Sequence, residues 1–186
     1  MLDTSLILPE RPRPLRRGEY DQLVRLGAFE GERVELLRGV VVEMTPNDPE
    51  HANPVDRLAE RLTVAIAGRA RVRVQQPLCA ADESEPEPDL AVVPLGDYRA
   101  EHPREALLVI EVARSSLRKD REVKGPLYAA SGFGEYWIVD VADHTVEVRR
   151  APHDETYRTV MRLAEGETLR PEAFPDVTVP VAEIFR

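Results

Sequence analysis

The chain has 186 residues, a hydrophobic fraction of 42% and a formal net charge of −9, which fits one acidic domain with a sizeable core. No apolar stretch approaches the roughly 20 residues needed to cross a bilayer, and the single cysteine excludes an internal disulfide, so we expect a cytoplasmic protein without membrane association. The negative charge argues against a protein that coats nucleic acid non-specifically, because phosphate contacts need clustered cations.

The first predicted elements follow a segment rich in proline and arginine. We expect residues 1–16 to form a flexible, extended arm ahead of a single domain at 17–186. A short helix is predicted at about 19–26. The pattern of residues 34–44 then predicts a hairpin that turns at Arg38–Gly39.

A longer amphipathic helix is predicted at about 54–68, because apolar residues recur there at spacings of three and four. Its start is left open between two N-terminal signals, Asn53–Pro54 and Asp48–Pro49. Strands are expected after it at about 71–76, 89–93, 106–112, 135–141, 145–150 and 156–162, with one helix between Asp120 and Ser131. The proline-punctuated segment 171–186 should form short edge structure. The fold class is therefore α/β or α+β with a mixed sheet.

Two carboxylates fall at corresponding places in neighbouring predicted strands. If the strands pair antiparallel with residue 91 opposite 109, Asp89 faces Glu111 at a Cβ separation of about 5 Å. Carboxylates that close need a shared proton, an arginine or a divalent cation, and oxygen ligands favour Mg²⁺ or Mn²⁺. Glu111 also interrupts an apolar strand and needs a partner. An ion pair with a nearby arginine and a metal site both remain open.

Basic residues are almost all arginine, and the two lysines, Lys119 and Lys124, both follow Glu111 closely. A lysine retained in such a chain marks a place that needs a compact ammonium group, or else it is a chance survivor on a solvated helix. Arg69, Arg71 and Arg73 alternate along a predicted strand and would form a ladder on one face. Such a ladder fits either a phosphate-binding face or a plain solvent face.

The two acids resemble the signature of the PD-(D/E)xK nuclease superfamily, here as Pro88–Asp89 and Glu111-Val112-Ala113. The third signature position is a lysine in that superfamily and is Ala113 here, so Lys124 on the next helix is the candidate replacement. A longer series of motifs is similar to the bacterial Uma family of putative restriction endonucleases. The segments that carry this resemblance are 34–44, His51, 85–93, 108–113, 115–117, 120–124, 126–129 and 132–140.

The resemblance implies a restriction-endonuclease-like mixed sheet flanked by helices, a homodimer, DNA as substrate and Mg²⁺ or Mn²⁺ as cofactor. It implies that Asp89, Glu111 and the carbonyl of Val112 hold the metal, and that Lys124 orients or helps to deprotonate the attacking water. Glu35 and His51 are further candidates, although a hairpin residue and a helix-entry histidine can equally be structural.

The predicted function is therefore a metal-dependent endonuclease that hydrolyses DNA phosphodiester bonds. The alternative is a catalytically inactive nuclease-fold protein that binds nucleic acid or another protein. Arg114 and Lys119 add positive charge beside the acids, and we expect Lys119 to be an exposed charge that attracts phosphate. Arg114 would either strengthen phosphate binding or pair with Glu111 and displace the metal.

Overall fold

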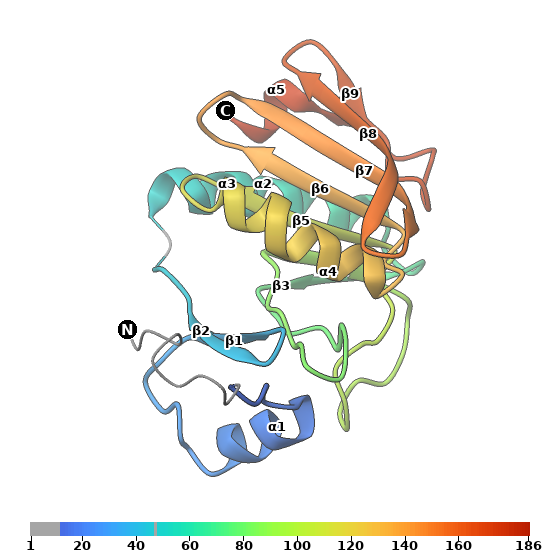
Figure 1. The fold of residues 1–186 in the computed structure, drawn as a ribbon. Coiled ribbons are helices and arrows are strands. Elements are labelled where there is room, and N and C mark those ends of the chain that lie inside the picture. The colour runs from blue at the N-terminus through green and yellow to red at the C-terminus, as the bar shows by residue number, and fades with distance from the viewer. Residues whose placement is uncertain (1–11, 47) are drawn as a thin grey trace.

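The computed structural model describes residues 12–46 and 48–186. Its centre is a six-stranded sheet in the order β3-β4-β5-β6-β7-β8, antiparallel except for the parallel pair β5–β6 (Figure 1). The strands are β3 (Arg71–Val74), β4 (Leu90–Val93), β5 (Leu108–Ala113), β6 (Glu135–Asp140), β7 (Thr145–His153) and β8 (Thr156–Ala164). All six strands expected from the sequence are present, and the predicted mixed-sheet fold class is confirmed.

The remaining elements lie around this sheet. The helices are α1 (Arg17–Arg25), α2 (Pro49–Ala65), α3 (Leu117–Lys119), α4 (Gly125–Ala130) and α5 (Val181–Ile184), and a π-helical turn, η2 (Asp120–Lys124), joins α3 to α4. Two small sheets are formed by β1 (Val34–Leu37) with β2 (Val40–Glu43), and by β9 (Thr168–Leu169) with β10 (Val179–Pro180). Within the described residues, no helix is long and apolar enough to span a lipid bilayer.

Helix α2 begins at the earlier of the two candidate start signals. Asp48 is its N-cap, and one carboxylate oxygen accepts a hydrogen bond from the backbone N–H of His51 at 3.0 Å. Pro49 occupies the first helical position, where its missing N–H costs no hydrogen bond. The structure thus decides between the two signals in favour of Asp48–Pro49, and the extra turn ahead of Pro54 carries His51 to the end of the sheet.

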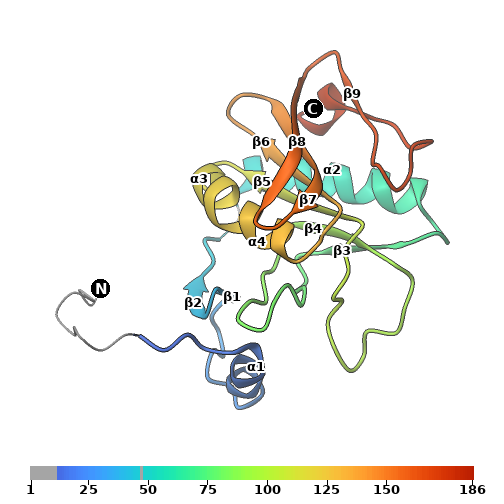
Figure 2. The same cartoon turned by 45° about the vertical axis from the view of Figure 1, so that its right-hand side comes forward.

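The two faces of the sheet are covered by different helices. Helix α2 and the C-terminal segment pack on one face, whereas η2 and α4 cover the other (Figure 2). Because side chains alternate along β5, Val109, Glu111 and Ala113 share a face, and the apolar members of that set pack in the same cluster as Tyr128 of α4. Glu111 therefore lies beneath the helix that follows Lys124.

The C-terminal segment differs from its prediction. Its strands and helix are short, as expected, but they do not form the edge of the main sheet. Apolar side chains of this segment enter the core beside α2, namely Phe174, Val177, Val179, Val181 and Ile184. The segment was predicted as edge structure because of its prolines, yet the apolar residues between them cover the flank of α2.

The β1–β2 hairpin turns at Arg38 and Gly39, as predicted, and both residues have positive φ. Glycine is favoured at position 39 for two reasons: its φ is positive, and a side chain there would collide with Pro14. The N–H of Leu15 donates to the carbonyl of Gly39 at 3.0 Å, so residues next to α1 lie against the hairpin. Residues 1–11 of the predicted arm lie outside the described residues, and the division at residue 16 remains a prediction.

Candidate active site

The register of β4 and β5 brings the two predicted acids together. Ala91 pairs with Val109 and Leu90 with Ile110, and the next residues in this register are Asp89 and Glu111. The predicted antiparallel pairing is confirmed. Both carboxylates line a cleft with a volume of about 150 Å³ at the ends of the two strands.

Charged side chains dominate this cleft. Five carboxylates line it, opposed by three cationic side chains and one histidine. The acids are Asp48, Glu87, Asp89, Glu111 and Asp120, and the bases are Arg114, Lys119, Lys124 and His51. Counted formally, with all five acids ionised and the histidine neutral, the lining has two more negative than positive charges (five minus three), and a negative cleft of this kind attracts a cation.

Both carboxylate oxygens of Asp89 accept hydrogen bonds. Oδ1 lies 2.9 Å from Nε2 of His51, and Oδ2 accepts the backbone N–H of Val112 at 2.8 Å. Burial opposes ionisation of Asp89, but the hydrogen bond and charge of His51 outweigh it, and the pKa of Asp89 falls below its usual value. Burial lowers the pKa of His51, and the contact with Asp89 reverses that shift, so the net pKa of the imidazole is raised.

Glu111 is buried, and its Oε1 accepts two hydrogen bonds. Nζ of Lys124 lies 2.8 Å away, and the hydroxyl of Tyr128 lies 2.6 Å away. Burial raises the pKa of Glu111 to about 8, against the opposing charge of Lys124. The partner that an acid in an apolar strand requires is therefore a lysine, and the alternative of an arginine ion pair, left open by the sequence, is not formed among the described residues.

Lys124 is 2% exposed and also lies 3.0 Å from Oε2 of Glu35. Burial alone would lower the pKa of this lysine, but the charges of Glu111 and Glu35 raise it above its usual value. Its side chain is therefore a fixed ammonium group in the same cluster as the two acids. Residue 113 is an alanine, and the ammonium group of this cluster comes instead from η2, the next helical segment.

Glu35 reaches the cluster from the β1–β2 hairpin and is fully buried. Its Oε2 accepts the backbone N–H of Glu87 at 3.2 Å, and its Oε1 lies 3.2 Å from Nζ of Lys119. Lys119 is therefore half-buried and paired, contrary to its prediction as an exposed charge. Both lysines of the chain contact Glu35, which makes the hairpin part of the candidate site.

Two further side chains of this cluster were not predicted as site residues, although both belong to motif segments. Asp120 is almost fully buried, and its Oδ2 accepts the hydroxyl of Ser116 at 2.5 Å. Its buried Oδ1 has no hydrogen-bond partner among the described residues, and burial raises the pKa of the carboxyl. Tyr128 is the other. Asp120, Lys124 and Tyr128 follow one another at intervals of four residues. This spacing was the sequence signal for both site residues, because it places all three side chains on one helical face.

Arg114 does not pair with Glu111. Its guanidinium group contacts Asp48 at 2.5 Å and Glu50 at 2.7 Å, at the start of α2. The predicted competition between Arg114 and a metal for Glu111 is therefore absent from this arrangement.

The predicted arginine ladder is only partly present. Arg71 and Arg73 lie in β3, and both guanidinium groups approach the ring of Tyr98. Arg69 precedes the strand, in the turn after α2, where it pairs with Asp176 at 3.0 Å. None of the three arginines lines the acidic cleft. The predicted three-arginine ladder is wrong at Arg69, because strand β3 begins two residues after it.

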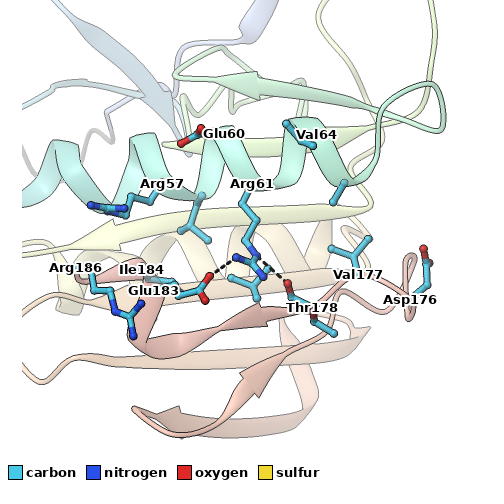
Figure 3. Close-up of a pocket in the computed structure, with 13 residues that line it drawn as sticks. Arg57, Glu60, Arg61, Val64, Asp176, Val177, Thr178, Glu183, Ile184 and Arg186 are labelled. Atoms are coloured by element: carbon cyan, nitrogen blue, oxygen red, sulfur yellow. Dashed lines mark hydrogen bonds and ion pairs between the residues drawn. The ribbon is translucent and has the colours of Figure 1, made fainter.

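A larger groove of about 640 Å³ lies elsewhere, between α2 and the C-terminal segment (Figure 3). Arg61 crosses it, with Nε donating to the carbonyl of Thr178 at 2.8 Å and Nη1 paired with Glu183. Figure 3 shows Arg57 and Arg186 at one end and Asp176 at the other. Opposite charges are spread along the groove, and nothing in it matches the buried acids and lysine of the cleft.

The donor set of the cleft fits one class of metal. Among residues 12–46 and 48–186, no group of three or more His, Cys, Asp and Glu side chains is placed to hold an ion. Asp89 and Glu111 supply two carboxylates, and Mg²⁺ commonly takes only one or two protein carboxylates together with water and substrate phosphates. The residues present therefore fit a hard divalent cation bound jointly with a substrate, and not a cation enclosed by protein ligands alone.

Comparison with known proteins places the chain in a family. A solved structure of similar fold is described as that of a putative nuclease belonging to DUF820 from Anabaena variabilis ATCC 29413. It has a TM-score of 0.75 and 14% sequence identity, and the match covers 92% of this chain and 98% of that one. No curated protein matches the chain. The profile of the Uma2 family, described as "Putative restriction endonuclease", matches residues 18–182, and the chain therefore belongs to the Uma2 family.

Proposed function

We propose that this protein is a metal-dependent endonuclease that hydrolyses phosphodiester bonds of DNA. The observation that carries the proposal is the convergence of Asp89 and Glu111 with the buried ammonium group of Lys124. An acidic cleft that holds one fixed cation can bind a divalent ion, and its lysine can contact an anionic oxygen. Membership of the Uma2 family supports the same reaction class.

In this proposal Asp89, Glu111 and the backbone carbonyl of Val112 hold Mg²⁺ or Mn²⁺, as the resemblance implies. When bound, the ion neutralises charge on the scissile phosphate and activates water. Asp89 is ready for this role because the N–H of Val112 and the ring of His51 fix both of its oxygens. His51 thus orients a ligand from the start of α2.

Lys124 stabilises negative charge that develops on the phosphate, rather than removing a proton from water. Its ammonium group lies within 3.0 Å of two carboxylates, which keep it protonated. Glu35 acts through Lys124, because it is buried against the lysine and has no other cation within ion-pairing distance except Lys119 among the described residues. A fixed point charge costs no reorganisation when the reaction begins.

The path of DNA and the assembly state remain predictions. We propose that Lys119 and Arg114, both on the rim of the cleft, contact phosphates after exchanging their present carboxylate partners. In this proposal Arg69, Arg71 and Arg73 bind DNA outside the cleft. We also propose a cytoplasmic homodimer, and the mass in solution by light scattering tests the dimer directly.

Plasmid nicking with Mg²⁺ or Mn²⁺ tests the proposed reaction. We expect the wild-type protein to nick supercoiled DNA, and both Glu111→Gln and Lys124→Met to lower the rate at least about 100-fold. The matched control is Glu183→Gln, which removes a carboxylate from the larger groove and should leave nicking unchanged. Circular dichroism confirms that each variant is folded.

Two results would contradict the proposal. Nicking that persists in both cleft variants would place the activity elsewhere or in a contaminant. A wild-type protein that binds DNA but never nicks it would favour the alternative, a catalytically inactive nuclease-fold protein that binds nucleic acid. A protein that neither binds nor nicks DNA would favour the other form of the alternative, an inactive nuclease-fold protein that binds another protein.

A further inference from the structure

The four carboxylate oxygens of Asp89 and Glu111 are not equivalent. Both oxygens of Asp89 accept hydrogen bonds, one from the N–H of Val112 and one shared with the ring of His51. Oε1 of Glu111 accepts two, from Lys124 and Tyr128. Oε2 of Glu111 accepts none from residues 12–46 and 48–186. Since each carboxylate oxygen has two lone pairs, Oε2 of Glu111 is the oxygen with both lone pairs free for a cation, whereas Oε1 has already used both.

Tyr128 is firmly placed to produce this asymmetry. Its side chain is fully buried, and its ring packs against Phe133 at 5.7 Å and edge-on against Tyr136 at 5.0 Å. It lies four residues after Lys124, so both donors approach Glu111 from the same helical face. Two donors held by packed side chains fix one oxygen of the carboxylate and thereby limit rotation of the whole group.

A tyrosine suits this place because its hydroxyl is a neutral donor. A second ammonium or guanidinium group at Oε1 would also hold the oxygen, but its charge would repel a divalent cation a few ångströms away. The hydroxyl fixes the carboxylate without adding positive charge. Lys124 already provides the one charge that the buried acids need.

We propose that Tyr128 is a positioning residue for the metal. Its hydroxyl, together with Lys124, holds Oε1 of Glu111 and so presents Oε2 to the divalent cation. The proposal rests on the proposed function, because it requires that Glu111 binds such a cation. Removing a donor that orients a metal ligand typically weakens metal binding 10–100-fold.

Calorimetric titration of the full chain with MnCl₂ tests the role without depending on turnover. We expect Tyr128→Phe to weaken Mn²⁺ binding roughly 10–100-fold. The matched control is Tyr157→Phe, because Tyr157 belongs to the same buried cluster and its hydroxyl donates to the carbonyl of Phe133 at 2.9 Å, away from the acids. The control should bind Mn²⁺ like the wild type while losing a similar amount of thermal stability.

A second variant separates a lost donor from a disturbed fold. Replacing Tyr128 with 4-aminophenylalanine keeps a neutral N–H donor at the ring position of the hydroxyl, and it should restore most of the Mn²⁺ affinity. Equal affinity in Tyr128→Phe and the wild type would overturn the positioning role. Equal weakening in Tyr128→Phe and Tyr157→Phe, or no recovery with the amino group, would also overturn it. A wild-type protein that binds no Mn²⁺ would overturn the proposed function as well, which distinguishes the two failures.

Discussion

The small cleft at the ends of β4 and β5 and the larger groove beside α2 both contain acids and bases, but they bury them differently. In the cleft, Lys124 and Glu111 have side chains that are 2% and 6% exposed. In the groove, Arg61 and Glu183 are 36% and 41% exposed. The groove has about four times the volume of the cleft (640 Å³ against 150 Å³), yet its charges are solvated and carry little energy.

The difference shows why burial of charge, and not the size of a hollow, marks the candidate site. A buried ion pair contributes little net stability, because desolvation offsets the attraction, so a fold gains little by keeping one for structure alone. Three acids, Glu111, Glu35 and Asp120, surround one buried lysine, and Oδ1 of Asp120 has no hydrogen-bond partner in the part of the chain that the structure describes. A chemical role explains this arrangement better than packing does.

The largest expected effect comes from removing the cation of the cleft. Lys124→Met leaves Glu111 and Glu35 buried without their shared cation, and we expect it to lower the free energy of unfolding by about 3–5 kcal/mol. Urea denaturation at pH 7 measures the change. A loss below about 1 kcal/mol would mean that the acids are neutral in the folded protein and that the ammonium group is not needed to stabilise them.

Glu85, a further buried acid, shows how burial affects a carboxyl group that accepts no hydrogen bond from a cation among the described residues. Burial, reinforced by Asp21, raises its pKa to about 7 from an ordinary value of 4.5. A folded-state pKa above the unfolded one means that the folded protein holds the proton more tightly. The associated stability is complete below about pH 4.5 and is lost as pH rises through about 7.

We therefore expect Glu85→Gln to remove this pH dependence. Between pH 5 and pH 8 the wild-type protein should lose up to about 3 kcal/mol relative to the variant, since one pKa unit corresponds to about 1.4 kcal/mol. Thermal melts of both proteins across this range measure the difference. Parallel curves for the two proteins would show that Glu85 is ionised in the fold at all these pH values.

In the groove, Arg61→Met should have a much smaller effect than the same substitution at Lys124. It removes one hydrogen bond to the carbonyl of Thr178 and one half-exposed ion pair with Glu183, and we expect a loss of about 1 kcal/mol. The Lys124→Met and Arg61→Met variants are compared by urea denaturation under identical conditions. Losses of equal size would mean that burial does not separate the two regions.

The sequence predicted the part of the site that depends on strands, and missed the part that depends on helix packing. The pairing of Asp89 with Glu111 followed from the apolar pattern of two strands, because antiparallel register fixes which residues face each other. The place of Lys124 came from motif resemblance. The spacing of four residues places Tyr128 on the same helical face as Lys124, but its contact with Glu111 also depends on how α4 lies over β5, which no local pattern encodes.

The remaining errors have a similar cause. Lys119 was expected to be exposed, but the hairpin that brings Glu35 beneath it is distant in sequence. Arg69 was assigned to a strand because the alternation of arginines continues backwards into a turn. In both places the local pattern was correct for its own segment, and tertiary contacts decided the outcome.

The smallest expected effect concerns Arg114, at the rim of the cleft. Its ion pairs with Asp48 and Glu50 are solvent-exposed, and the two acids already lie favourably at the N-terminus of α2. Arg114→Gln should therefore lower the stability less than any of the changes above, and the difference from the wild type should vanish in 1 M NaCl. Because Arg114 does not contact Glu111, the variant should bind Mn²⁺ at least as tightly as the wild type, since it removes a repelling charge near the cation. Weaker Mn²⁺ binding in Arg114→Gln would show that this arginine supports the metal ligands, and would extend the site from its buried cluster to the rim of the cleft.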